Sequence, residues 1–164
     1  MRLLVIGAGP AGTRCAVRLA ERLPASAVTL AGAEAALPYD RVALSKLLAG
    51  DATMEGLITH PLALLRGLGI VYRPATPIAA IDRAASEAVT TRGERLGYDR
   101  LVLATGSSAI RLPLPGPRCR EWCSTGTWTT CGRCCGPRPA AARRSSSAAG
   151  CWGWRRRSGW PRGG

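Results

Sequence analysis

Short apolar runs alternate with turn-forming residues as far as about residue 104. Residues 2–6 are apolar after Arg2, which is typical of a strand buried on both faces of a sheet. A helical pattern follows from Pro10 to Leu23, with proline in its first turn. Five further strand-like runs lie at 28–31, 70–72, 77–81, 87–91 and 101–104. Strands and helices in this order predict an α/β fold.

Two shorter helices are expected between residues 37 and 67. The stretch 37–50 predicts a loop that leads into a helix ended by Gly50. Thr59-His60-Pro61 predicts the cap of a helix that runs to about Gly67. His60, the only histidine, is therefore expected at a helix start and not in catalysis. Cys15 is expected to be a small buried residue on the first helix.

The first strand and the first helix are joined by Gly7-Ala8-Gly9-Pro10-Ala11-Gly12. In such a unit the first glycine permits the tight turn, the second lets a pyrophosphate approach the backbone, and the third lets helix and strand pack closely. The helix N-terminus adds unpaired N–H groups and a partial positive charge. Glu34 lies 22 residues beyond Gly12, where an acid can bind a ribose hydroxyl. The expected ligand is a dinucleotide, and glycines that serve only the turn are the alternative.

The composition changes sharply near Gly116. Residues 117–164 hold ten of the 23 Lys and Arg but one of the ten Asp and Glu, together with all five Trp and six of the seven Cys. They contain no Ile, Leu, Val, Met or Phe, so they have little to offset the entropy of ordering a core. We therefore expect a domain over 1–116 and a disordered or irregular tail over 117–164. The single cysteine before the tail and the short apolar start favour a cytoplasmic protein without a membrane segment.

Three motifs occur in order: GAGPAG at 7–12, PYDRVALSK at 38–46 and YDRLVLATGS at 98–107. Together they resemble the FAD-binding half of the pyridine-nucleotide flavoprotein oxidoreductases, most of all the large subunit of NAD(P)H nitrite reductase, with ferredoxin and rubredoxin reductases next. The resemblance covers residues 1 to about 116 and implies a Rossmann-type, three-layer FAD-binding domain. It also implies FAD as cofactor, NAD(P)H as electron donor and an unidentified electron acceptor, and we expect no metal site.

The resemblance also implies which residues hold FAD. The expected contacts are Gly7, Gly9, Ala11 and Gly12 around the pyrophosphate, Glu34 at the ribose, Ile78 by its backbone near the adenine, Arg41 and Lys46, and Thr105 and Gly106 closing over the cofactor. Lys46 is the one catalytic candidate, because an ammonium group beside the flavin stabilises negative charge on the reduced ring. Relatives usually carry the ribose acid one place earlier, at Ala33, so Glu34 departs from the family pattern. Without the resemblance, Arg41 and Lys46 would be interpreted as solvated charges.

Two interpretations of the tail stay open. A basic segment with Trp and Cys can bind nucleic acid, although its cysteine spacing is not the paired C-x-x-C of a zinc ribbon. The interpretation we favour is translation in the wrong reading frame. If each original codon joins the third base of one tail codon to the first two bases of the next, Cys151-Trp152-Gly153 must encode Leu-Gly, and codon choices across 144–157 permit a second glycine-rich nucleotide motif. The nucleotide sequence around codons 112–120 tests this interpretation.

The body of the chain (residues 1–116) and the tail together define the expected function. The body is expected to be a fragment of an FAD-dependent NAD(P)H oxidoreductase, and the main expectation is the electron-input module of a nitrite reductase. One alternative is a flavoprotein like the ferredoxin and rubredoxin reductases. Another is an inactive truncated relic, because in this family a return segment after the nicotinamide domain completes the FAD site. Nucleic-acid binding through the basic tail is the remote alternative.

Overall fold

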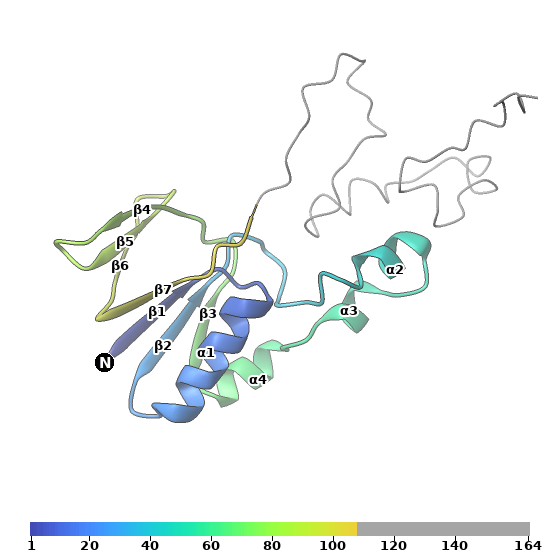
Figure 1. Ribbon diagram of the computed structural model, residues 1–164, viewed down its shortest axis with the longest axis horizontal. Coiled ribbons are helices and arrows are strands. Elements are labelled where there is room, and N and C mark those ends of the chain that lie inside the picture. The colour runs from blue at the N-terminus through green and yellow to red at the C-terminus, as the bar shows by residue number, and fades with distance from the viewer. Residues whose placement is uncertain (108–164) are drawn as a thin grey trace, which may run out of the picture.

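The computed structural model describes residues 1–107 and shows an α/β domain (Figure 1). Its elements are β1 (Arg2–Ile6), α1 (Pro10–Arg22), β2 (Ala27–Ala31), α2 (Leu44–Ala49), α3 (Met54–Leu57), α4 (Leu62–Gly67), β3 (Ile70–Arg73), β4 (Ile78–Asp82), β5 (Glu87–Thr90), β6 (Arg95–Gly97) and β7 (Arg100–Leu103). The expected strands all form, each within one residue of its predicted ends. The helix α1 ends one residue before the predicted Leu23.

Four strands form a parallel sheet in the order β3-β2-β1-β7. Within it, Leu3 of β1 pairs with Val28 of β2 on one side and with Arg100 of β7 on the other. Residues 3–6 are buried, as predicted for a strand covered on both faces. The strand order reverses beside β1, because β2 and β7 lie on opposite sides of it. In open α/β sheets, ligands bind outside the carboxyl end of the strands at such a point.

The parallel sheet is the middle of three layers (Figure 1). Leu3 and Val5 belong to the core on the face covered by α1 and α4. Leu4 and Ile6 belong to a separate core on the opposite face, where they pack with Ala88 of the antiparallel sheet β4-β5-β6. This division follows from the period of two in a strand, which sends neighbouring side chains to opposite faces. The three-layer Rossmann-type fold predicted from the sequence is confirmed, and its third layer is the antiparallel sheet.

A smaller core lies apart from the sheet, where α2 and α3 project from the domain (Figure 1). Tyr39, Leu44 and Leu57 are its buried centre. Gly50 ends α2 in the left-handed conformation, with φ of +86°, as expected of a glycine that stops a helix. We call residues 38–59 the small unit.

Some local predictions were incomplete. The short elements α3 and β6 were not expected from the sequence, because their four and three residues are too few to show a periodic pattern. Thr59 does not cap α4, since its hydroxyl donates to the carbonyl of Pro38 and Pro61 stands at the cap position. Cys15 is half-buried and not buried. The expectations for residues 117–164 lie outside the described residues, and within residues 1–107 no helix is long and apolar enough to cross a membrane.

Asp99 fixes the start of β1. Its Oδ2 accepts a 2.6 Å hydrogen bond from Arg2 N, its Oδ1 accepts from the Arg2 guanidinium at 3.2 Å, and its own N–H donates to Arg2 O at 2.9 Å. The backbone bond from Arg2 is the main reason that the pKa of Asp99 lies below its ordinary value. A carboxylate with a lowered folded pKa stabilises the fold above its unfolded pKa of about 4, and that stabilisation is lost as the pH falls through the folded pKa.

We therefore expect Asp99→Asn to lower the melting temperature at pH 7 and to flatten its decrease below about pH 4. Thermal unfolding between pH 3 and pH 7 measures both effects. Glu55→Gln, which changes an exposed carboxylate on α3, is the control and should keep the acid dependence of the parent chain. Equal acid dependence in the two variants would contradict this role of Asp99.

Candidate functional site

The glycine-rich turn stands at the carboxyl end of β1, and two of its glycines are required by close backbone contacts. Gly7 has φ of +108°, and a Cβ there would lie 2.1 Å from the carbonyl oxygen of Ala104, just after β7. A Cβ on Gly12 would lie 1.8 Å from the carbonyl oxygen of Gly7. The turn therefore packs directly against β7, and α1 against the turn, as the sequence predicted for these two positions.

Gly9 differs from both, because a Cβ on it would meet no protein atom within 4 Å. Its backbone is extended, with φ of −72°, and it stands at the cap position of α1 with Pro10 next in the helix. The fold itself therefore does not require glycine here. The N–H groups in the first turn of a helix lack partners within the helix, and they attract anions. The open space in front of Gly9 and the exposed neighbour Ala11 is thus suited to a phosphate group.

Glu34 lies beyond the carboxyl end of β2 and is paired with two residues of the second sequence motif. Its Oε2 accepts a 2.7 Å hydrogen bond from the hydroxyl of Tyr39, and its Oε1 forms an ion pair with Arg41. The Arg41 guanidinium also lies 5.7 Å from the centre of the Tyr39 ring. Burial, with a smaller contribution from the charge of Glu34, raises the pKa of Tyr72 to about 12. Tyr72 therefore stays neutral and donates to the carbonyl of Ala36 at 2.6 Å.

Three further predicted contacts, Ile78, Thr105 and Gly106, lie at the same edge of the sheet. Thr76 N donates to Gly32 O at 2.7 Å, which brings the start of β4, with the half-buried Ile78, beside the end of β2. Thr105 and Gly106 follow β7 and are exposed, and Gly106 has φ of +73°. The structure thus gathers the glycine turn, the Glu34 and Arg41 pair and these two loops at the carboxyl edge, because parallel strands end on one side.

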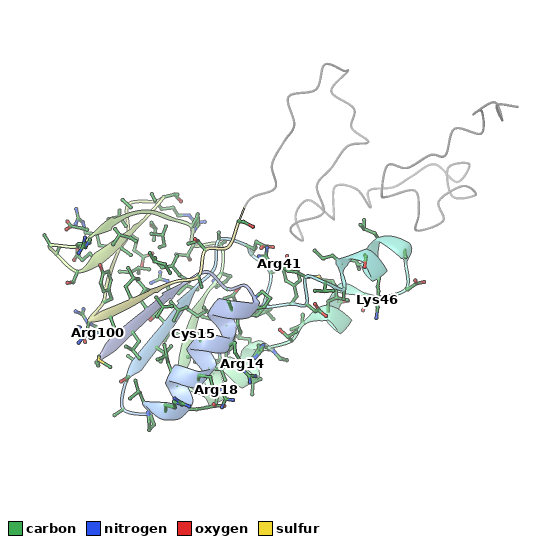
Figure 2. All side chains as sticks on the ribbon, viewed as in Figure 1. Arg14, Cys15, Arg18, Arg41, Lys46 and Arg100 are labelled. Carbon is green, nitrogen blue, oxygen red and sulfur yellow. The ribbon has the colours of Figure 1, made fainter. Side chains whose placement is uncertain are left out.

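Lys46 is the predicted contact that lies apart from this group. It is exposed on α2 in the small unit, and Figure 2 shows it beyond Arg41, away from the glycine turn. Within residues 1–107 no ion pair holds it, in contrast to Arg41. An exposed ammonium on a projecting helix has access to a ligand that extends past Arg41. Its place beside the flavin stays a prediction.

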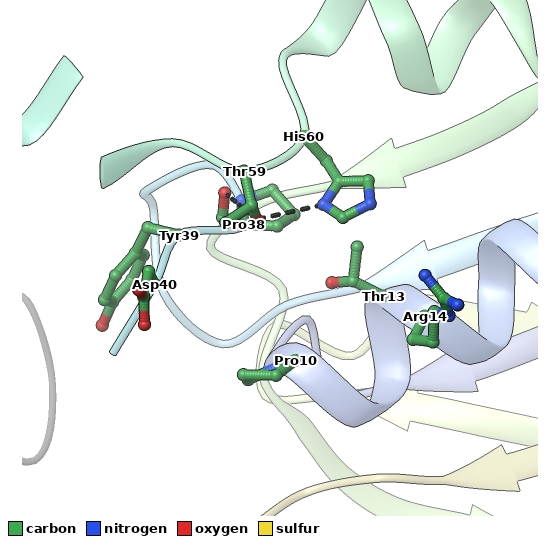
Figure 3. Close-up of a pocket in the computed structure, with 8 residues that line it drawn as sticks. All are labelled: Pro10, Thr13, Arg14, Pro38, Tyr39, Asp40, Thr59 and His60. Carbon is green, nitrogen blue, oxygen red and sulfur yellow. Dashed lines mark hydrogen bonds between the residues drawn. The ribbon is translucent and has the colours of Figure 1, made fainter. Parts of the chain in front are cut away.

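A small cavity of about 200 Å³ lies between the start of α1 and the segments 38–40 and 59–60 (Figure 3). His60 lines it, and its Nδ1 is 3.0 Å from the hydroxyl of Thr59. His60 precedes α4, in agreement with the expected position at a helix start. No sequence pattern predicts this cavity, because it forms between segments that are far apart in the chain.

Sequence reasoning also missed Tyr39 and Tyr72 as parts of the site. Both hydroxyls donate hydrogen bonds to the loop after β2. The Tyr39 hydroxyl donates to the Glu34 side chain, and the Tyr72 hydroxyl donates to the backbone carbonyl of Ala36. Tyr39 stands inside the second motif, so the motif contained the signal. The hydrogen bond between Tyr39 and Glu34 could not be predicted, because the period of apolar residues says nothing about how these two polar side chains meet.

Comparisons with known proteins agree with this geometry. The chain is 36% identical over 116 residues to the protein named "Probable ferredoxin reductase CtmF" of Castellaniella defragrans, a match that covers 70% of this chain and 28% of the relative. It is 35% identical over 117 residues to rhodocoxin reductase of Rhodococcus erythropolis, covering 71% of this chain and 27% of the relative. The chain thus matches little more than a quarter of the length of these relatives.

A solved structure gives the same result. The crystal structure of the covalent putidaredoxin reductase–putidaredoxin complex matches with a TM-score of 0.65 and 32% identity, over 68% of this chain and 27% of that chain. The sequence pattern of the pyridine nucleotide-disulphide oxidoreductases matches residues 1–135, which is most of the chain and runs past Gly116. The chain therefore belongs to the pyridine nucleotide-disulphide oxidoreductase family, of which it contains the N-terminal FAD-binding part.

Proposed function

We propose that the chain is the FAD-binding part of an NAD(P)H-dependent electron-transfer flavoprotein of the ferredoxin and rubredoxin reductase type. The single observation that carries the proposal is the contrast among the glycines of the turn. Gly7 and Gly12 are required by the fold, whereas Gly9 faces open space where an added Cβ would meet only a ligand. A glycine with no role in folding, at the N-terminus of α1, fits the pyrophosphate of a dinucleotide.

The names of the relatives support this type over the nitrite reductase module that the sequence motifs favoured. One relative is named a ferredoxin reductase, another a rhodocoxin reductase, and the matching solved structure is a complex of a reductase with putidaredoxin. By this analogy the electron acceptor is a small ferredoxin-type electron-transfer protein, and the nitrite reductase role becomes the second candidate. A cytoplasmic location belongs to the same proposal.

The residues at the carboxyl edge have distinct tasks in this function. Bound FAD supplies the redox chemistry, and the protein binds and orients it. The first turn of α1 binds the pyrophosphate, Glu34 accepts from a ribose hydroxyl, and Arg41 offsets the negative charge of Glu34 beside the phosphates. Lys46 is the only lysine of the chain, and its ammonium stabilises negative charge at the flavin end. The backbone near Ile78 borders the adenine, and Thr105 and Gly106 close the site.

Titration of the 164-residue chain with FAD and with FMN tests the proposal. FMN lacks the adenylate that the glycine turn and Glu34 recognise, so we expect FAD to bind at least about tenfold more tightly. Because the chain matches only 28% of the length of a relative, we expect its affinity for FAD to be weak. Isothermal titration calorimetry measures both affinities. Equal affinity for FAD and FMN would contradict a dinucleotide site, and stoichiometric yellow protein on purification would contradict weak binding.

A further inference from the structure

Tyr39 has its ring in one part of the molecule and its hydroxyl in another. The residue is 6% exposed, and its ring packs with Leu44 and Leu57 in the small unit. The hydroxyl donates its 2.7 Å hydrogen bond to Glu34, just after β2 of the parallel sheet. One side chain therefore joins the core of the small unit to the edge of the sheet.

Glu34 offers a fixed end for this bond. Its backbone carbonyl accepts a 2.9 Å hydrogen bond from Ala75 N, in the turn after β3. The backbone of Glu34 is therefore fixed to the parallel sheet. Tyr39 and Arg41 hold the two carboxylate oxygens from the small unit. A carboxylate offers about four acceptor positions, so these bonds leave it able to accept from a sugar hydroxyl.

The small unit depends on the same short segment. Tyr39 pairs with Ile58 in an isolated antiparallel bridge. The neighbouring backbone hydrogen bonds, each 2.9 Å, run from Asp40 N to Leu57 O and from Thr59 N to Pro38 O. The end of α3 is thereby fixed to the segment before α2, and α2 packs on the Tyr39 ring. The position of Tyr39 consequently sets the position of the helix that carries Lys46.

We propose that Tyr39 is a positioning residue that sets both ends of the cofactor site. Its hydroxyl orients the Glu34 carboxylate toward the ribose and anchors the ring to the edge of the sheet, and the anchored ring holds α2 so that Lys46 stands at the flavin end. This inference rests on the proposed function, since it assigns Glu34 and Lys46 to the same dinucleotide. Loss of the hydroxyl should therefore weaken two contacts at opposite ends of the ligand.

Tyr39→Phe tests the proposal, because it keeps the ring in the small core and removes only the hydroxyl. The first measurement is the ratio of the affinities for ADP and 2′-deoxy-ADP, which reads the contact between Glu34 and the ribose. We expect a ratio of at least about ten in the parent chain, as for one hydrogen bond to a charged group, and a fall to within about threefold in Tyr39→Phe. The second is acetylation of Lys46, read by mass spectrometry, which FAD should slow in the parent chain and should not slow in Tyr39→Phe.

Tyr98→Phe is the matched control. Tyr98 is 9% exposed and packs in the core between the parallel sheet and the antiparallel sheet, away from the small unit. It should keep both the nucleotide ratio and the protection of Lys46, whatever its effect on the melting temperature. If Tyr39→Phe also keeps both, the proposal is overturned.

Hydrogen exchange separates this inference from the proposed function. If the parent chain neither distinguishes the two nucleotides nor shows FAD protection of Lys46, the proposed function fails. The link between Tyr39 and α2 is then read from the α2 amides, compared with those of α1 as an internal reference. Faster exchange of α2 in Tyr39→Ala, which removes the ring on which α2 packs, supports the link, and unchanged exchange overturns it.

Discussion

Gly9→Ser should leave the chain folded and remove most of its affinity for FAD. A Cβ at Gly9 meets no protein atom within 4 Å, and the extended backbone at this position suits any residue. Serine is also a preferred helix cap, so the substitution should preserve or raise the melting temperature. The added side chain occupies the space that we assign to the pyrophosphate. We expect FAD affinity to fall by at least about a hundredfold, which corresponds to roughly 3 kcal/mol, and Gly9→Val to have the same effect.

Two further glycine substitutions make this experiment specific. Gly12→Ala should prevent folding, because its Cβ would lie 1.8 Å from the backbone oxygen of Gly7. Gly67→Ala, at a helical glycine with no atom within 4 Å of the added Cβ, should change neither folding nor FAD affinity. Circular dichroism with calorimetry gives both quantities for each variant. Native FAD affinity in Gly9→Ser would show that the open space is not the cofactor site.

These glycines also show what the sequence can predict. The need for glycine at positions 7 and 12 follows from a local strand–turn–helix pattern, although the Ala104 carbonyl that approaches Gly7 comes from a distant part of the chain. The two cores follow from alternation in β1, where Leu3 and Leu4 face opposite layers. Both features depend on neighbours in the chain, and the structure contains both.

The arrangement around Glu34 could not be obtained in this way. The motif identified Arg41 as a cofactor contact, but its ion pair with Glu34 depends on how the small unit docks against the sheet. The small unit is closed by the bridge between Tyr39 and Ile58, which are 19 residues apart and share no periodic pattern, and it docks on the sheet through the Tyr39 hydroxyl at Glu34. The same docking places Lys46, which a motif can name but cannot position. The finer resemblance to nitrite reductase relied on such motif spellings, whereas two relatives of this chain are named ferredoxin and rhodocoxin reductases.

The largest effect is expected in hydride transfer from NAD(P)H. This reaction needs the nicotinamide ring held against the flavin, and the effective molarity of such positioned reactions reaches ~10⁵–10⁸ M. Residues 1–107 contain a single glycine-rich dinucleotide turn, at 7–12, and our proposal gives that turn to FAD. With FAD supplied, the 164-residue chain should therefore oxidise NADH and NADPH no faster than free FAD does. Stopped-flow measurement of flavin reduction decides this, and robust turnover by the chain itself would contradict it.

If the wrong-frame interpretation of the tail is correct, a chain with the reading frame restored there should reduce artificial electron acceptors, and Lys46 can be tested in it. There, Lys46→Ala should slow flavin reduction by about 10²-fold, the effect of removing one group that stabilises developing negative charge. Lys46→Arg, which keeps the charge, should recover part of the rate. Arg66→Ala removes an exposed cation from α4 instead and should leave the rate unchanged. A lysine that is merely exposed to solvent would behave like Arg66. Equal rates of flavin reduction in the Lys46→Ala and Arg66→Ala variants would therefore contradict a role for Lys46 at the flavin.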